Sequence, residues 1–146
     1  EVLEKSGLLG FSNNDIYDRF RSRIMFPIWN ASGKIIAFGG RVFGTDDPAK
    51  YMNSPETPLY RKSEIFYGLN LTRDAIRKNE CAIMVEGYTD LIQLFQAGIK
   101  NVVAVSGTAF TEKHVQQIRR FSSKVYLAYD GDSAGIKASL RAGYVL

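Results

Sequence analysis

The sequence predicts an α/β fold: a parallel sheet with flanking helices, preceded by a small basic α+β subdomain that contains an antiparallel hairpin. From residue 80 onward, short apolar segments and amphipathic segments alternate three times, which is typical of parallel strands with crossover helices. Before residue 80, two β-type segments flank a short turn, which indicates a hairpin. We therefore place a domain boundary near residue 79, between a first part, 1–79, and a second part, 80–146.

The first part is expected to begin with one or two short helices within its first 20 residues, with Ser12 or Asn13 as a cap. RIMFPIWN and KIIAFGGRV then form the hairpin around the turn ASG. Pro27 suits an edge strand or a bulge, because proline cannot donate a ladder hydrogen bond. The stretch 44–64 holds three of the four prolines and lacks periodicity, so we expect a long functional loop there, followed by a helix to Asn79.

The second part is predicted to alternate regularly. Its expected strands are CAIMVEG, VVAVSG and KVYLAYDGD, and its expected helices are TDLIQLFQAG, TEKHVQQIRRF and the segment that begins SAGIKASL. Gly98 is a suitable residue just past the end of the first helix, and Thr111 is a plausible cap for the second. His114, in a helix of mostly polar residues, is expected to be exposed and inert.

Composition and charge limit the classes of function. No apolar run among the 146 residues is long enough for a membrane span, and a single cysteine with a single histidine excludes a thiol-rich zinc site. The net charge is +4, but the segment from Arg19 to Lys62 carries eight Lys or Arg against three acidic residues, a net of +5. This segment indicates either a binding partner that is a polyanion or a solvated charged face.

Acidic residues follow the ends of two predicted strands. Glu86 ends the first strand, Asp90 falls in the first turn of the next helix, and Asp130 and Asp132 end the third strand on either side of Gly131. Ligands collect at the carboxyl ends of strands in open parallel sheets. The four carboxylates therefore converge on one edge if the first and third strands are neighbours.

Crowded carboxylates repel one another unless a cation neutralises them. Oxygen ligands without nearby histidine or cysteine favour a hard ion, Mg²⁺ or Mn²⁺. Two structural alternatives stay open: Asp132 is well placed to cap the helix that follows it, and Glu86 could favour a helix N-terminus through the helix dipole.

The motifs VEGYTD and YDGDSAG, about 40 residues apart, resemble those of the Toprim domain. The segments DRFRSRIMFPIWNASGKIIAFGGRV, KYMNSPETPLYRKSEIFYGL and VEGYTDLIQLFQAGIKNVVAVSGTAFT resemble the RNA polymerase core of DnaG-type bacterial primases. The resemblance covers the chain from about Tyr17 onward. It implies a metal-dependent enzyme that makes short RNA primers from ribonucleoside triphosphates on a DNA template during replication.

The resemblance also assigns residues. It implies that Glu86, Asp90, Asp130 and Asp132 are catalytic, that all of these except Asp90 bind metal, and that nucleic acid or nucleotide contacts come from Arg41, Lys50, Asn53, Lys62 and Tyr88. The implied cofactor is Mg²⁺ or Mn²⁺, with two ions in the complete enzyme and no zinc in this part. Tyr51 and Tyr60 could stack template bases or pack in the core.

The implied partners are single-stranded DNA template, ribonucleoside triphosphates and the RNA primer, in the bacterial cytoplasm at replication forks, with no membrane. Contacts with the replicative helicase and the single-strand-binding protein are expected through other regions. We expect the 146 residues to be a fragment that lacks the family's last acidic strand, folds, binds metal weakly and makes no primers alone. Alternatives are a non-catalytic Toprim DNA-binding module of the recombination-mediator type, or a Toprim nuclease or topoisomerase domain.

Overall fold

The structure is a computed structural model that describes residues 5–12, 15–105, 107 and 109–146. The chain forms two compact units, Glu1–Arg61 and Lys62–Leu146. The division falls earlier than residue 79, because the helix α2 (Leu69–Asn79) packs its buried residues Leu69 and Ile76 into the core of the second unit.

The first unit begins with a pair of antiparallel strands, β1 (Leu9–Ser12) and β2 (Asp15–Asp18). The prediction of short helices here was wrong. Gly10 pairs with Tyr17, and a Cβ atom on Gly10 would lie only 2.3 Å from the Tyr17 ring. Cross-strand packing on Gly10 therefore outweighs the helix-capping signal of the sequence. Of the two cap candidates, Ser12 lies in β1, and Asn13 lies outside the described residues.

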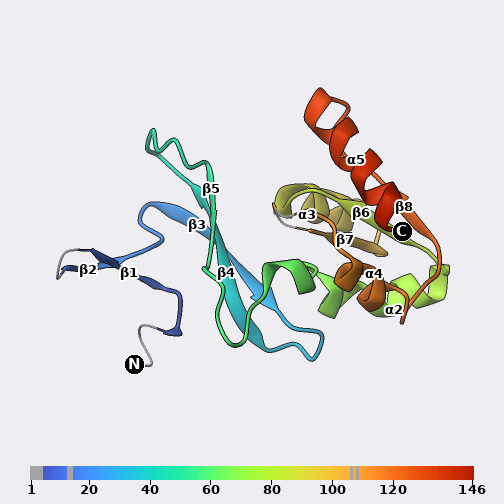
Figure 1. The fold of residues 1–146 in the computed structure, drawn as a ribbon, viewed down its shortest axis with the longest axis horizontal. Helices are drawn as coiled ribbons and strands as arrows, with labels where there is room; N and C mark the ends of the chain where they lie inside the picture. The colour runs from blue at the N-terminus through green and yellow to red at the C-terminus, as the bar shows by residue number, and fades with distance from the viewer. Residues whose placement is uncertain (1–4, 13–14, 106, 108) are drawn as a thin grey trace. The chain divides into compact units, whose positions relative to one another are not determined.

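A three-stranded antiparallel sheet, in the order β3-β4-β5, forms the rest of the first unit (Figure 1). The predicted hairpin is confirmed as β3 (Arg23–Trp29) and β4 (Ile35–Val42). Pro27 lies in the edge strand β3, as expected, opposite Phe38. The strand β5 (Tyr51–Asn53) lies inside the stretch expected to be a loop, because a strand of three residues gains its stability from pairing with β4 rather than from its own pattern.

The second unit contains the predicted parallel sheet, in the order β7-β6-β8 (Figure 1). Its elements follow one another as η1 (Lys62–Glu64), α2, β6 (Ala82–Val85), α3 (Tyr88–Gln96), β7 (Val102–Ala104), α4 (Glu112–Ile118), β8 (Val125–Leu127) and α5 (Ser133–Val145). Both neighbours of β6 pair with it in parallel. The expected alternation of strand and helix is therefore confirmed in this unit.

Local signals set the ends of these helices. Gly98 follows the end of α3 with a φ of +92°, a conformation that glycine adopts at low cost. Thr111 precedes α4, and its side chain accepts a hydrogen bond from the His114 backbone N–H. Each of these helix ends therefore lies where the sequence predicts it.

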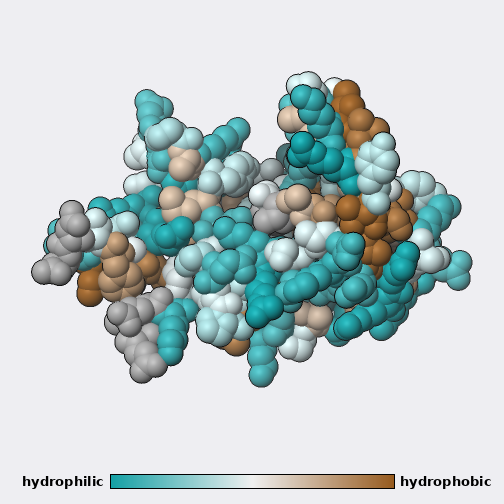
Figure 2. Space-filling view, in the orientation of Figure 1, coloured by the Kyte–Doolittle hydropathy of each residue, from teal (hydrophilic) through white to brown (hydrophobic). Residues whose placement is uncertain are grey.

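The core of the second unit lies between the sheet and its helices. It joins residues of β6 and β7 to residues of three helices, α2, α4 and α5, and of the loop segments beside them: Phe66, Leu69, Ile76, Ala82, Met84, Val103, Val105, Phe110, Val115, Ile118 and Ala142. The helix α5 also carries hydrophobic side chains on its outer surface (Figure 2). Ile136, Leu140 and Tyr144, four residues apart, are exposed, so this stripe of α5 contributes nothing to the core.

Within the described ranges, every helix is too short or too polar to cross a lipid bilayer.

Burial predicts a contrast between two residues of α2. Ile76 is fully buried, whereas Leu71 is 63% exposed. Ile76→Ala should lower the free energy of unfolding by about 2–5 kcal/mol through lost burial and a cavity. Leu71→Ala should change it by less than about 0.5 kcal/mol. Urea denaturation of the two variants measures the difference, and equal effects would contradict the assignment of α2 to the second unit's core.

Candidate active site

The ends of two neighbouring strands meet at Glu86 and Asp130. Because β6 and β8 are parallel and adjacent, with Met84 opposite Leu127, the residues that follow each strand lie at the same edge of the sheet. The Asp130 backbone N–H donates a hydrogen bond to Glu86 Oε1, with 3.2 Å between nitrogen and oxygen. The predicted convergence is therefore confirmed for these two strand ends.

Asp90 lies in the first turn of α3, and its carboxylate caps the start of that helix. Its Oδ2 accepts a hydrogen bond from the Gly87 backbone N–H at 3.0 Å, which is one half of a capping box. The carboxylate is half-buried and faces the peptide that directly follows Glu86. This hydrogen bond to the residue after Glu86 therefore fixes the position of the Asp90 carboxylate.

Asp132 caps α5. Its Oδ1 accepts hydrogen bonds from the backbone N–H groups of Ala134, at 3.0 Å, and Gly135, at 2.8 Å. The capping alternative is therefore realised. The strand β8 ends at Leu127, so the alternation of an extended strand does not continue to Asp130 and Asp132, and their side chains are not held on one side by it.

Gly135 makes the loop between β8 and α5 possible. A Cβ atom at this position would lie 2.1 Å from the Asp130 carbonyl oxygen, so only glycine lets the first turn of α5 pack directly on the Asp130 backbone. Gly131, the residue singled out between the two aspartates, has open space around it and no left-handed φ. Sequence reasoning missed Gly135, whose signal is a glycine in the first turn of a predicted helix.

A cavity of about 270 Å³ opens beside Glu86. Glu86, Tyr129 and Arg141 supply its ionisable side chains, and the other lining residues are Val105, Gly107, Ala109, Phe110 and Ala138. Burial, with a smaller contribution from the nearby Glu86 carboxylate, raises the pKa of Tyr129 to about 12. The phenol is therefore protonated at neutral pH and donates to Met84 Sδ at 3.2 Å. The sequence did not predict a role for Arg141. Its guanidinium places a positive charge in the lining of the cavity, together with the Glu86 carboxylate.

The donors fit a hard divalent cation in kind but do not form a closed ligand set. Glu86, Asp90, Asp130 and Asp132 are all carboxylates, which Mg²⁺ and Mn²⁺ prefer. Among the residues the structure describes, no three His, Cys, Asp or Glu side chains come close enough together to hold a metal ion. Mg²⁺ characteristically takes one or two carboxylates and completes its shell with water and substrate phosphate, which suits a pair such as Glu86 and Asp130.

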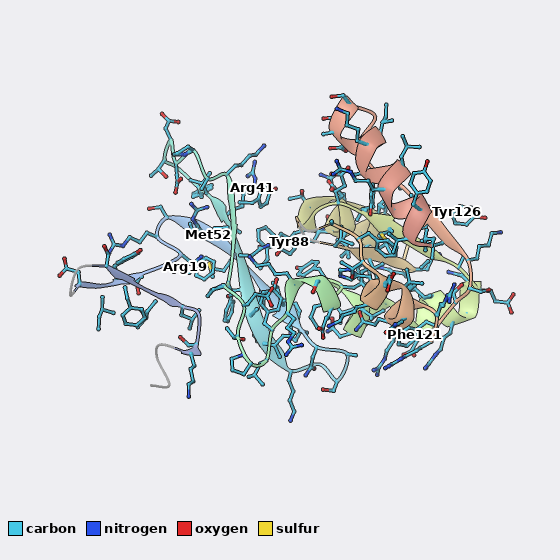
Figure 3. The ribbon with its side chains drawn as sticks, in the orientation of Figure 1. Arg19, Arg41, Met52, Tyr88, Phe121 and Tyr126 are labelled. Atoms are coloured by element: carbon cyan, nitrogen blue, oxygen red, sulfur yellow. The ribbon has the colours of Figure 1, made fainter. Side chains whose placement is uncertain are left out.

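Three of the predicted nucleic-acid residues lie together in the first unit. Arg41 lies on β4 (Figure 3) and pairs with Tyr51 on β5. Its guanidinium lies 5.9 Å from the centre of the Tyr51 ring. Lys50 directly precedes β5 and is exposed, and its carbonyl accepts the Val42 N–H at 3.0 Å. Asn53 ends β5. The β4–β5 ladder thus presents Arg41, Lys50 and Asn53 along one short stretch.

The two tyrosines considered above for base stacking differ in exposure. Tyr51 is 42% exposed, whereas Tyr60 is 2% exposed and its pKa is raised to about 12, chiefly by burial and also by Glu56. Tyr60 is therefore buried and has no exposed ring face to offer to a base. Arg23, one of the eight basic residues between Arg19 and Lys62, is not available to a polyanion. Its side chain is 1% exposed and pairs with Asp47.

The remaining two predicted contacts lie in the second unit. Lys62 begins η1 and is half-buried. Tyr88 is only 3% exposed and packs edge-to-face on Tyr67, with 4.5 Å between ring centres. The assignment of Tyr88 to the nucleic-acid contacts is therefore corrected: a ring buried against Tyr67 offers no face to a base, and it anchors the first turn of α3.

Comparison with known families divides the chain in the same order as its two parts. The family described as the DNA primase catalytic core, N-terminal domain, matches residues 1–73, and the Toprim domain family matches residues 80–146.

Similar proteins and solved structures agree with these families. A DNA primase of Listeria monocytogenes is 47% identical over 97% of this chain, which spans 23% of that primase. A crystal structure of a DNA primase domain from Pseudomonas aeruginosa superposes with a TM-score of 0.91 at 46% identity, covering 98% of this chain and 45% of that one. A structure of the DnaG primase catalytic domain bound to ssDNA superposes with a TM-score of 0.83 at 44% identity, covering 96% and 44%. The chain thus spans about a quarter of the length of the curated primases it matches.

Two glycines of α5 give a matched test of the loop that carries the aspartates. Gly135→Ala should destabilise the second unit by more than about 2 kcal/mol, because the new methyl group meets backbone rather than a movable side chain. Gly143→Ala, in open space on the same helix, should be neutral or stabilise by about 0.5–1 kcal/mol. Thermal unfolding of both variants decides; a harmless Gly135→Ala would refute the close packing of α5 on Asp130.

Proposed function

Because this chain belongs to the DNA primase catalytic-core family, we propose that it forms part of the centre at which a bacterial primase makes short RNA primers. In this proposal, ribonucleoside triphosphates are joined on a single-stranded DNA template at the replication fork, in the bacterial cytoplasm. The protein that carries out the whole reaction is longer than this chain, as its curated relatives are. Its helicase and single-strand-binding partners are proposed to contact other regions.

The observation that carries the proposal is the meeting of Glu86 with the Asp130 backbone at the carboxyl ends of two parallel strands. This edge is where open parallel sheets bind their ligands. Glu86 lines a cavity there that also contains the Arg141 guanidinium, and Asp90, Asp130 and Asp132 follow the same two strands in sequence. A site with carboxylates and a cation together suits a substrate that combines phosphates with divalent metal.

Toprim domains of primases generally use divalent metal ions. We assign the binding of Mg²⁺ or Mn²⁺ here to Glu86, Asp130 and Asp132, and two ions to the complete enzyme. A bound ion would neutralise charge on the triphosphate and activate the attacking hydroxyl. The chain's own contribution is to hold these carboxylates: Asp132 through its helix cap, and Glu86 through the Asp130 N–H. Asp90, as the fourth catalytic acid, fixes the turn after Glu86.

We assign contacts with template or nucleotide phosphates to Arg41, Lys50, Asn53 and Lys62. Basic side chains bind phosphates as charges or forks, and a similar primase domain has been solved with ssDNA. The exposed ring of Tyr51, beside Arg41, is suited to stacking on a base. The match of residues 1–73 to the primase catalytic core disfavours a recombination mediator, a nuclease or a topoisomerase.

The two roles of Asp132 can be separated by substitution. Asn caps helices about as well as Asp, so Asp132→Asn should leave stability nearly unchanged, whereas Asp132→Ala should lose about 1 kcal/mol with the cap. If Asp132 also binds metal, both variants should weaken Mn²⁺ binding about tenfold or more and should abolish ribonucleotide incorporation by the full-length primase.

Paramagnetic broadening by Mn²⁺ and incorporation on a single-stranded template provide the two measurements. Asp74→Asn, a change of an exposed carboxylate on α2, is the matched control. Should Asp132→Asn bind Mn²⁺ and extend primers like the parent, Asp132 would be a cap and nothing more.

Lys50 and Lys34 give a matched test of DNA contact in the first unit. Both are exposed, but Lys34 lies at the far end of β4 from Arg41. Lys50→Ala should weaken binding of a single-stranded oligonucleotide and reduce the slope of log K against log salt by about 0.7, the value for one lost phosphate contact. Lys34→Ala should leave the slope unchanged. Fluorescence anisotropy across a salt series measures both, and equal slopes would remove Lys50 from the interface.

A further inference from the structure

His114 is buried in the second unit, not exposed as the sequence predicts. It lies on α4 with no exposed surface, between two aromatic rings. The ring centre of Phe66 is 4.7 Å away, and the Phe110 ring is stacked on it at 5.7 Å. A buried imidazole is unexpected in a helix that reads as polar, and neither the proposed metal site nor the proposed phosphate contacts explain it.

The hydrogen bonds of His114 fix its tautomer. The Thr111 backbone N–H donates to Nδ1 at 3.2 Å, so Nδ1 carries a lone pair and the proton lies on Nε2. Nε2 in turn faces the Ile65 carbonyl at 3.4 Å, to which it can donate. The Thr111 hydroxyl donates to the Ser63 carbonyl at 2.7 Å. Thr111, which caps α4, and His114 within α4 thus bind the backbone of residues 62–65, called here the η1 turn, at two places.

These contacts join two parts of the proposed site. On one side they hold the turn that begins with Lys62. The Lys62 backbone favours the charged form of the imidazole and so acts to raise the pKa of His114. On the other side, Phe110, stacked on the imidazole, lines the cavity that contains Glu86. His114 is therefore the buried link between the η1 turn and the wall of the acidic cavity.

We propose that His114 is a positioning residue, which locks the η1 turn onto α4 so that the Lys62 ammonium is held where a nucleic-acid or nucleotide phosphate binds. This inference rests on the phosphate contact assigned to Lys62. It assigns no chemical step to His114, which acts through the Ile65 carbonyl and through Thr111, whose hydroxyl holds the Ser63 carbonyl.

A second contact between the same elements is weaker. Lys113 pairs with Glu64, but the Lys113 side chain is 56% exposed, and exposed ion pairs contribute little to stability. The interior contact through His114 and Thr111 therefore does most to hold the turn. Lys113→Ala serves as the control, because it breaks a contact between α4 and η1 without touching the imidazole.

Acid should release the turn. Burial lowers the pKa of His114 below 6.5, although the backbone groups of Ile65 and Lys62 and the Glu64 carboxylate favour the charged form. The charged residues on the two elements packed here are Lys62 and Glu64 on η1 and Glu112 and Lys113 on α4. As pH falls below 6.5, His114 becomes protonated in the unfolded chain but stays neutral in the folded chain, because its pKa is lower there. The stability contributed by neutral His114 is thus present above pH 6.5 and is lost as pH falls.

A double-mutant cycle tests the proposal in the intact chain. His114→Gln retains a capping-box side chain at this position of α4 but loses the aromatic stack and the Nε2 contact. Binding of a fluorescent oligothymidylate should weaken about tenfold for Lys62→Ala, through loss of one charged phosphate contact, and by a comparable factor for His114→Gln. The double variant Lys62→Ala/His114→Gln should bind the oligonucleotide no more weakly than Lys62→Ala alone. By contrast, any effect of Lys113→Ala on the binding free energy should add to that of Lys62→Ala.

Each result separates the two hypotheses. If Lys62→Ala binds like the parent, the phosphate role of Lys62 fails and this inference fails with it. If Lys62→Ala weakens binding but His114→Gln has no effect, or the two effects add, only the positioning role is overturned.

Hydrogen exchange provides a check that requires no stable variant. In the parent chain, the amides of 63–66 should exchange faster at pH 5 than at pH 7, after correction for intrinsic rates, while the amides of β6 stay protected. Equal protection of 63–66 at both pH values would also overturn the positioning role.

Discussion

The parallel pairing of β6 with β8 is the constraint on which the candidate site depends. It places residues 44 positions apart at one edge of the sheet, where the Asp130 N–H bonds to Glu86. Had β8 paired beyond β7 instead, Asp130 would be one strand farther from Glu86, about 5 Å more. The strand order, rather than any property of the acidic motifs alone, therefore makes a shared site possible.

Much of this arrangement could be predicted because its signals are local. Apolar runs of strand length, the glycine at 98 and the cap at Thr111 each report on a few neighbouring residues, and the structure places all three as expected. The convergence of Glu86 and Asp130 also follows from the sequence, given adjacent strands. The sequence left open whether Asp132 was a cap or a ligand, because both roles need a carboxylate before a helix.

What could not be predicted depends on contacts between distant segments. Gly135 is required because the Asp130 carbonyl lies where its Cβ would be. His114 is buried because Phe66 and the η1 turn cover a helix that reads as polar. The β1–β2 pair and the strand β5 form through pairing, against or without a local signal. In each case tertiary packing decides the outcome, and neither helical periodicity nor residue type reports it.

The caps also explain how the acidic edge tolerates its own charge. Asp90 and Asp132 accept hydrogen bonds from backbone N–H groups at the starts of α3 and α5, where helix dipoles favour negative charge. The Glu86 carboxylate accepts one from Asp130. These bonds offset part of the repulsion among the carboxylates and hold three of them, those of Glu86, Asp90 and Asp132, in place without a bound ion. Capping and the proposed metal binding are therefore compatible roles: the bonds that stabilise the helices would also preorganise the carboxylates for a cation and its phosphate ligand.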